Sequence, residues 1–188
     1  LSKMMIFSGN HDTDRTADVL RGNVGRMKIA MALLATMRGY PQIYTGDELM
    51  IRSVDLKQGH GGLRVDTPGG WAGDKVNLFT EEGRTGDVKE LFDFTRKLFQ
   101  WRKTKEVIHN GRTLHFMTRD NTYAYFRYND KEVVFVYINN SQEPKHLPWS
   151  YYAEITEGLS AGRNVITGET VTLSDDTVVA PEQALVVE

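Results

Sequence analysis

A carboxylate and an imidazole stand next to each other near the start of the chain, at Asp12 and His11. They belong to the polar run Gly9-Asn10-His11-Asp12-Thr13-Asp14-Arg15, which directly follows the apolar segment Met4 to Phe7. That segment is short and continuous, as is typical of a parallel strand buried on both faces. Active sites of β/α barrels lie at the carboxyl ends of such strands, so both side chains are placed where chemistry is expected. A structural role is an equal alternative, with Asp12 capping a helix or turn and His11 satisfied within a loop.

The elements that would position this run follow the order strand, helix, strand. Apolar residues recur at helical spacing from Asn23 to Arg38, and Gly39 then supplies a C-terminal stop. Tyr40 to Tyr44 indicates a short strand whose proline sits at its entry. Residues 45–86 are rich in glycine and show little periodicity, and such long segments in compact proteins are usually functional or disordered. A second amphipathic helix is predicted from Asp87 to Lys103.

The pattern changes to short β-strands in the second half of the chain. Residue type, spacing and turn-prone pairs predict strands at Leu114 to Thr118, Thr122 to Tyr128, Val133 to Ile138, Tyr151 to Ile155, Asn164 to Ile166, Thr170 to Leu173 and Ala184 to Val187. These intervals are typical of a β-sandwich. Because helical periodicity ends near Thr104, we predict one domain over residues 1–104 and a second over residues 105–188.

Composition excludes several classes of function. The 188 residues are 40% hydrophobic and 26% charged, an ordinary globular balance, and the formal net charge of -2 argues against a nucleic-acid partner. With no cysteine there is no thiolate nucleophile, disulfide or cysteine-based zinc site. No stretch is long and apolar enough for a membrane span. The opening residues lack the features of a signal peptide and lead at once into an apolar run, so we expect the chain to be cut from a larger protein.

Two motifs resemble the α-amylase family, family 13 of the glycoside hydrolases. Phe7-Ser8-Gly9-Asn10-His11-Asp12 is similar to the end of the family's seventh barrel strand, and its continuation through Arg15 resembles the cyclomaltodextrinase and neopullulanase branch. Gly39-Tyr40-Pro41-Gln42-Ile43-Tyr44-Thr45-Gly46-Asp47-Glu48 resembles the eighth strand and its following loop. The segment Arg64 to Trp71 is similar to Bacteroides-type neopullulanases of starch-utilisation systems, and the C-terminal β region resembles the family's domain C.

The resemblance implies an α/β plus all-β fold. Strands 7 and 8 of a (β/α)8 TIM barrel, with their helices, would form the first part, and an antiparallel β-sandwich would follow. The implied partners are an α-glucan oligosaccharide substrate and the missing N-terminal part of the same polypeptide. The resemblance implies no cofactor or metal in this chain, with calcium possible in the parent protein, and it leans towards a periplasmic enzyme.

Site residues also follow from the resemblance. The family uses a nucleophilic aspartate, a glutamate acid/base and a second aspartate that stabilises the oxocarbenium-like transition state, and Asp12 corresponds to the last of these. His11 matches the histidine that hydrogen-bonds sugar hydroxyls. Arg15 would hold substrate or brace Asp12 through a charge-assisted bond, with a solvated turn arginine as the equal alternative.

Several other residues have side chains that could act as a nucleophile, stack on a sugar or bind a metal. Asp66 fits the Gly-x-Arg-x-Asp pattern around the family's nucleophile, but no apolar strand leads into it, so we interpret it as a loop residue. Trp71 and Tyr44 could stack on sugar rings, although anchoring the loop is the favoured interpretation. The remaining histidines show no metal-ligand spacing.

Two functions remain open from the sequence. In the first, the chain is part of a retaining α-glucan hydrolase; it supplies Asp12 but lacks the nucleophile and the general acid, so the isolated chain is inactive. In the second, the chain is a non-catalytic carbohydrate-binding or docking module whose sandwich binds glucan.

Overall fold

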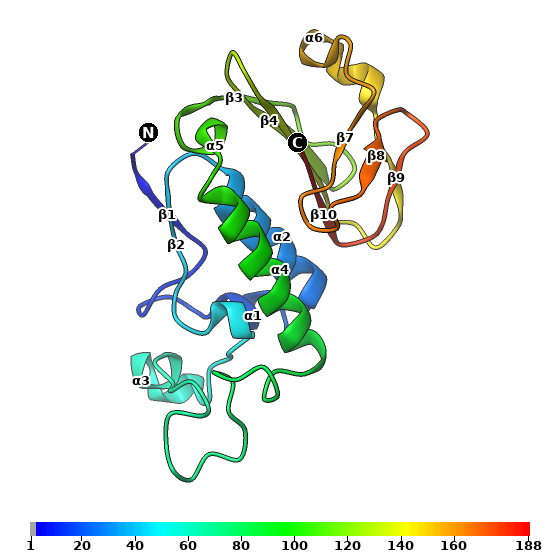
Figure 1. Cartoon of the computed structure of the whole chain (residues 1–188). Coiled ribbons are helices and arrows are strands. Elements are labelled where there is room, and N and C mark those ends of the chain that lie inside the picture. Colours follow the sequence, from blue (N-terminus) through cyan, green and yellow to red (C-terminus); the bar gives the residue numbers. More distant parts are fainter. Residues whose placement is uncertain (1–2) are drawn as a thin grey trace.

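The computed structural model describes residues 3–188 and separates the chain into a β/α part and an antiparallel β part. In Figure 1, strands β1 and β2 lie on one side of the two long helices, and the antiparallel strands lie on the other. The helices therefore form a middle layer that is shared by both parts.

The first part is a parallel strand–helix–strand unit. Strand β1 (Met5–Phe7) pairs in parallel with β2 (Tyr40–Gln42), and the connection carries α1 (Thr16–Val19) and α2 (Val24–Thr36). This is the strand–helix–strand order that the sequence predicts. The side chain of Asn23 caps α2 by accepting the amide of Arg26 at 3.0 Å.

Glycine is required where the chain turns from α2 into β2. Gly39 has a φ of +114°, and a Cβ there would lie 2.6 Å from the carbonyl oxygen of Met4. Helix α2 has already ended at Thr36, with Met37 as its C-cap, so Gly39 is not the helix stop predicted from the sequence; it allows the two strands to come together.

The prediction that β1 is buried on both faces is wrong for this chain. Met5 is 57% exposed and Phe7 is 42% exposed. A parallel strand is buried when neighbouring strands and helices cover it, and within residues 3–188 only β2 pairs with β1.

The long segment between β2 and the next helix contains only short elements. These are two 3-10 turns, η1 (Asp47–Leu49) and η2 (Leu56–Gln58), and the single-turn helix α3 (His60–Leu63). Helix α4 (Gly86–Arg102) follows and packs against α2, and the short helix α5 (Glu106–Asn110) leads into the second part.

The second part is built on a four-stranded antiparallel sheet in the order β10-β5-β4-β3. Its strands are β3 (Arg112–His115), β4 (Thr122–Tyr128), β5 (Val133–Asn139) and β10 (Gln183–Val187). Two small sheets complete the sandwich, formed by β6 (Lys145–His146) with β9 (Val178–Val179) and by β7 (Ala161–Arg163) with β8 (Thr170–Thr172).

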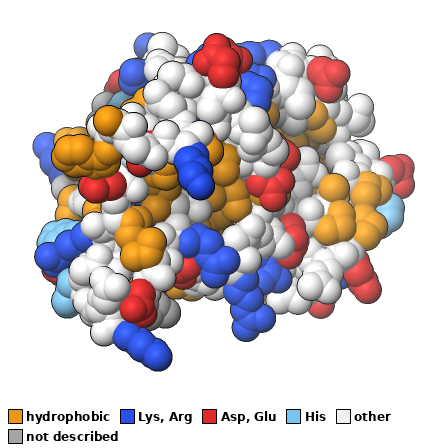
Figure 2. All heavy atoms as spheres, turned by 90° about the horizontal axis from the view of Figure 1, so that it is seen from below, with side chains coloured by type: hydrophobic (Ala, Val, Ile, Leu, Met, Phe, Trp, Pro, Cys, Tyr) orange, Lys and Arg blue, Asp and Glu red, His pale blue; other side chains and the backbone are white. Residues whose placement is uncertain are grey.

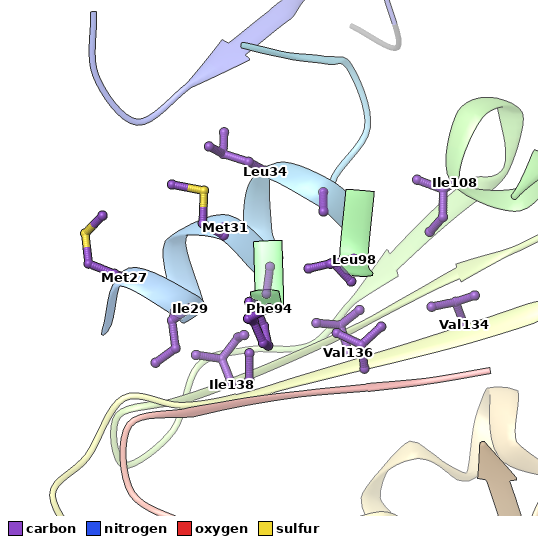
Figure 3. Close-up of a cluster of buried hydrophobic side chains, with 14 of the residues drawn as sticks. Met27, Ile29, Met31, Leu34, Phe94, Leu98, Ile108, Val134, Val136 and Ile138 are labelled. Carbon is purple, nitrogen blue, oxygen red and sulfur yellow. The ribbon is translucent and has the colours of Figure 1, made fainter. Parts of the chain in front are cut away.

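Period-two alternation gives the central sheet two buried faces. Tyr125, Val136 and Ile138 face the helices and share one core with α2 and α4. Figure 3 shows Ile29, Phe94 and Leu98 from these helices gathered over Val136 and Ile138. The alternate residues face the small sheets and belong to a second, aromatic-rich core that contains Phe126, Phe135, Trp149 and Tyr152.

One predicted strand is a helix instead. Residues 151–155 lie in η3 (Trp149–Tyr152) and α6 (Ala153–Thr156), and the buried side chains are Trp149, Tyr152 and Thr156. Their spacing of three and four residues is that of one helix face. The prediction mistook aromatic, β-branched composition for a strand.

The predicted strand Asn164 to Ile166 is also displaced. The strand is β7, which ends at Arg163, and the side chain of Asn164 accepts the amides of Ile166 at 2.8 Å and Thr167 at 3.2 Å. This local turn stops the strand.

Candidate active site

The polar run after β1 forms a tight turn that projects Asp12 and His11 from the carboxyl end of the strand. The side chain of Asn10 accepts the amide of Asp12 at 2.8 Å, and the hydroxyl of Thr13 accepts the amide of Asn10 at 2.9 Å. The turn is thus fixed by its own side chains. The side chain of Asp12 remains 54% exposed and that of His11 60% exposed.

Three basic side chains surround the carboxylate of Asp12. Arg64 donates from Nη2 to Oδ1 at 2.8 Å, and Nδ1 of His60 lies 3.2 Å from the same oxygen. Nε2 of His11 lies 3.2 Å from Oδ2. Arg64 also donates from Nε to the backbone carbonyl of His11 at 3.1 Å. Arg64 thus holds Oδ1 through a hydrogen bond, while the two imidazoles lie close to the carboxylate without hydrogen-bonding to it.

His60 and Arg64 were not assigned to the site from the sequence. His60 begins α3 and Arg64 is the residue that ends it, so the two side chains are one helical turn apart. That spacing of four residues was a signal that the two side chains act together. Nothing in the sequence placed them opposite Asp12, which lies far earlier in the chain.

The structure does not bring Arg15 to Asp12. Arg15 is 1% exposed, and it donates from Nε to the carbonyl of Leu63 at 2.9 Å and from Nη1 to that of Thr45 at 2.7 Å. Its guanidinium lies 4.4 Å from the ring centre of Tyr44. In this arrangement Arg15 neither braces Asp12 nor reaches solvent, and it instead joins the turn after β1 to the loop after β2 and to the end of α3.

Tyr44 is held against Arg15, whereas Trp71 and Asp66 lie together in the loop after α3. Tyr44 packs under Arg15 and has the structural role that was favoured for it. Trp71 is 69% exposed, and its indole Nε1 donates to Oδ2 of Asp66 at 3.1 Å. Asp66 lies in irregular structure after α3, which agrees with its interpretation as a loop residue.

A buried carboxyl lies beneath the candidate site. Asp47 is 1% exposed, and its Oδ2 accepts the hydroxyl of Thr16 at 3.2 Å. Burial raises the pKa of Asp47 from 3.8 to about 6, although the Thr16 hydrogen bond and the charge of Arg15 oppose this rise. The fold therefore favours the neutral form of this carboxyl.

The raised pKa of Asp47 predicts how stability depends on pH. A folded-state pKa above the unfolded value contributes stability that is full below about pH 3.8 and is lost as the pH rises through about 6. Asp47→Asn is neutral throughout, so its free energy of unfolding should exceed that of the wild type at pH 7 by about 1–2 kcal/mol, and this difference should shrink towards pH 4. Urea unfolding at both pH values measures this. The exposed Asp176→Asn is the control, and parallel pH curves for Asp47→Asn and wild type would contradict the assignment.

Residues 3–188 hold neither a cluster of metal ligands nor a membrane-spanning helix. Over residues 3–188, no group of three or more histidine, aspartate or glutamate side chains is arranged to hold a metal ion. Among the same residues, no helix has the length and apolar character needed to cross a membrane.

Comparison with known proteins identifies the class of protein. The family model described as the α-amylase catalytic domain matches residues 2–132, and that of the cyclomaltodextrinase C-terminal domain matches residues 113–188. The chain therefore belongs to the α-amylase family of glycoside hydrolases, and this confirms the resemblance of its two barrel motifs.

Curated relatives include a cyclomaltodextrinase and a maltogenic α-amylase. The chain is 28% identical to a cyclomaltodextrinase from Thermoanaerobacter pseudethanolicus, over 72% of this chain and 21% of the relative. It is 30% identical to a maltogenic α-amylase from Bacillus acidopullulyticus, over 77% of this chain and 22% of the relative. The chain thus spans about a fifth of the length of these relatives.

Solved structures support the fold. An α-amylase from Geobacillus thermoleovorans, complexed with acarbose, matches 99% of this chain with a TM-score of 0.68 and 22% identity, and the match covers 38% of that protein. A maltogenic amylase from S. marinus matches 96% of this chain with a TM-score of 0.66 and 17% identity, covering 22% of that protein. The end of a catalytic barrel followed by a β-sandwich is thus the architecture of this chain.

Proposed function

We propose that this chain is part of a retaining α-glucan hydrolase that cleaves α-1,4-glucosidic bonds, and that Asp12 stabilises its transition state. The observation that carries the proposal is the position of Asp12 at the carboxyl end of β1, where Arg64 hydrogen-bonds its carboxylate and the imidazoles of His11 and His60 lie 3.2 Å from it. In a barrel of this family, that end of the strands is where substrate is bound.

The arrangement fits the third acid of a glycosidase. Glycoside hydrolysis passes through an oxocarbenium-ion-like transition state, and hydrogen bonds to sugar hydroxyls strengthen as that state forms. A carboxylate that is already oriented pays little reorganisation when it accepts such bonds. His11 would add a further donor to the same sugar.

In our proposal, the nucleophile and the acid/base are residues outside this chain. Retaining hydrolysis requires a nucleophile and an acid/base about 5–5.5 Å apart, which a single aspartate does not provide. We propose that they lie on earlier strands of the barrel. Because the relatives are a cyclomaltodextrinase and a maltogenic α-amylase, we propose cyclodextrins, pullulan and maltooligosaccharides as the substrate class.

The proposal predicts different activities for the chain and for the complete protein. The chain of 188 residues should release no product from γ-cyclodextrin or maltoheptaose, whereas the complete protein should hydrolyse them. Proton NMR of the first product should show the α-anomer, as retention requires. Release of the β-anomer, or turnover by the chain alone, would contradict the proposal.

A binding measurement distinguishes the hydrolase proposal from the alternative, a non-catalytic binding module. If maltoheptaose bound the chain tightly, at residues after Gly111, the sandwich would be the functional part. Our proposal expects weak binding at most, confined to the part before Gly111.

A further inference from the structure

We infer that Trp71 and Asp66 form a sugar-binding platform for an α-glucan, at a position separate from Asp12. This inference rests on the proposed function, because it takes the same substrate class. It adds a second contact for the glucan, on the loop between β2 and α4.

The ring of Trp71 is exposed and unoccupied. It is 69% exposed, and within residues 3–188 it takes part in no aromatic pair and has no cation over its face. The other two tryptophans differ from it. Trp149 lies in the aromatic core, and Trp101 is partly buried and donates from Nε1 to Glu188 at 2.6 Å. Among the described residues, no aromatic ring or cation therefore covers the face of Trp71.

The orientation of Trp71 is fixed at both ends of the residue. Its indole Nε1 donates to Asp66 at 3.1 Å, and its backbone amide donates to Oδ2 of Asp74, also at 3.1 Å. Asp74 accepts the amide of Gly69 at 2.6 Å as well. A ring that is held in advance loses little conformational entropy when a ligand stacks on it.

The loop around Trp71 is closed by a backbone hydrogen bond. The amide of Leu78 donates to the carbonyl of Pro68 at 2.9 Å, which joins the two ends of the loop. Gly69 has a φ of +110°, and a Cβ there would lie 2.2 Å from Oδ1 of Asn77. The turn requires glycine at this position, so the sequence favours this loop conformation.

The chemistry of the platform suits a pyranose ring. An aromatic face offers apolar area to the C–H face of the sugar, and a carboxylate beside it accepts hydroxyl groups. Within the described residues the hydrogen bond of the Asp66 side chain uses Oδ2 only, so Oδ1 is available to a sugar hydroxyl.

The platform follows a partner of Asp12 closely along the chain. Arg64, which donates to Asp12, precedes Asp66 by two residues, a span of at most about 7 Å along the backbone. Figure 2 views the molecule from below, the side where Figure 1 places this loop, and shows hydrophobic side chains exposed among charged ones.

A sugar fits this surface better than a protein partner does. Stable protein interfaces bury about 800 Å² on each partner around an apolar centre. Here one indole ring is bordered by the charged residues Asp66, Asp74 and Lys75, all of them exposed. A narrow aromatic face with a carboxylate at its edge matches a single sugar unit in size and polarity.

The test uses the 188-residue chain with maltoheptaose, followed by amide NMR shifts. Maltoheptaose should shift the amides of residues 66–79, and Trp71→Ala should weaken the affinity roughly tenfold, as expected for the loss of one stacked ring. Trp71→Phe, which keeps an aromatic face, should stay within about threefold of the wild type. Tyr151→Ala removes an aromatic ring that is 42% exposed on the sandwich and should have no effect.

Two results would overturn the platform. One is maltoheptaose affinity in Trp71→Ala equal to that of the wild type; the other is the absence of shifts in residues 66–79. Either could occur while Asp12 keeps its proposed role, because that role is tested separately by turnover of the complete enzyme. Unchanged amide positions outside the loop in Trp71→Ala would show that the variant remains folded.

Discussion

In the complete enzyme that contains this chain, Asp12→Asn should lower kcat by about a thousandfold, the scale of removing a group aimed at transition-state charge. The amide keeps the size of the side chain but loses the negative charge that faces the oxocarbenium-like sugar. Because Asp12 and its partners are about half exposed, the free energy of unfolding should change by less than about 1 kcal/mol. Steady-state turnover of γ-cyclodextrin and a thermal melt measure the two effects.

Asp14→Asn is the matched control for this experiment. Asp14 is exposed in the same turn, and within residues 3–188 its side chain makes no hydrogen bond or ion pair. Its substitution should leave kcat near the wild-type value. Near-normal turnover by Asp12→Asn would remove the basis for its assigned role.

The second large effect is expected at Arg15, on stability. Arg15→Met keeps an unbranched apolar side chain but leaves the carbonyls of Leu63 and Thr45 without their donor. Hydrogen bonds to charged groups contribute about 1.5–3 kcal/mol each, so the free energy of unfolding should fall by about 3 kcal/mol. Urea unfolding of the 188-residue chain measures this.

Arg112→Met separates this effect from a general loss of positive charge. Arg112 is 65% exposed, and its ion pair with Asp130 lies at the surface. Its substitution should change the free energy of unfolding by no more than about 0.5 kcal/mol. Equal stabilities for the two variants would mean that the buried hydrogen bonds of Arg15 contribute nothing measurable.

Regular elements were predictable because their periodicity is a local property of the sequence. The helices expected at Asn23 to Arg38 and Asp87 to Lys103 are α2 and α4, each within two residues at either end. The strand expected at Thr122 to Tyr128 is β4. Where tertiary packing decided the outcome, prediction failed: the side chains of Trp149 and Tyr152 could be recognised as one helix face only once the aromatic core was known.

The candidate site was predictable in part. The position of Asp12 and His11 after a strand follows from the order of elements along the chain. Their partners His60 and Arg64 come from a glycine-rich loop without periodicity, where no local pattern indicates which distant residues will meet. The burial of Arg15 was equally hidden, because its partners are backbone carbonyls, which every residue carries.

A crystal structure of the complete enzyme with a bound, uncleaved maltooligosaccharide is the most direct test of the role of Asp12. We predict that its carboxylate lies within about 3 Å of hydroxyls on the sugar at the cleavage point, with two further carboxyl groups across the same glycosidic bond. A bound glucan whose cleavage point is far from Asp12, with that side chain facing away from it, would contradict the proposed function.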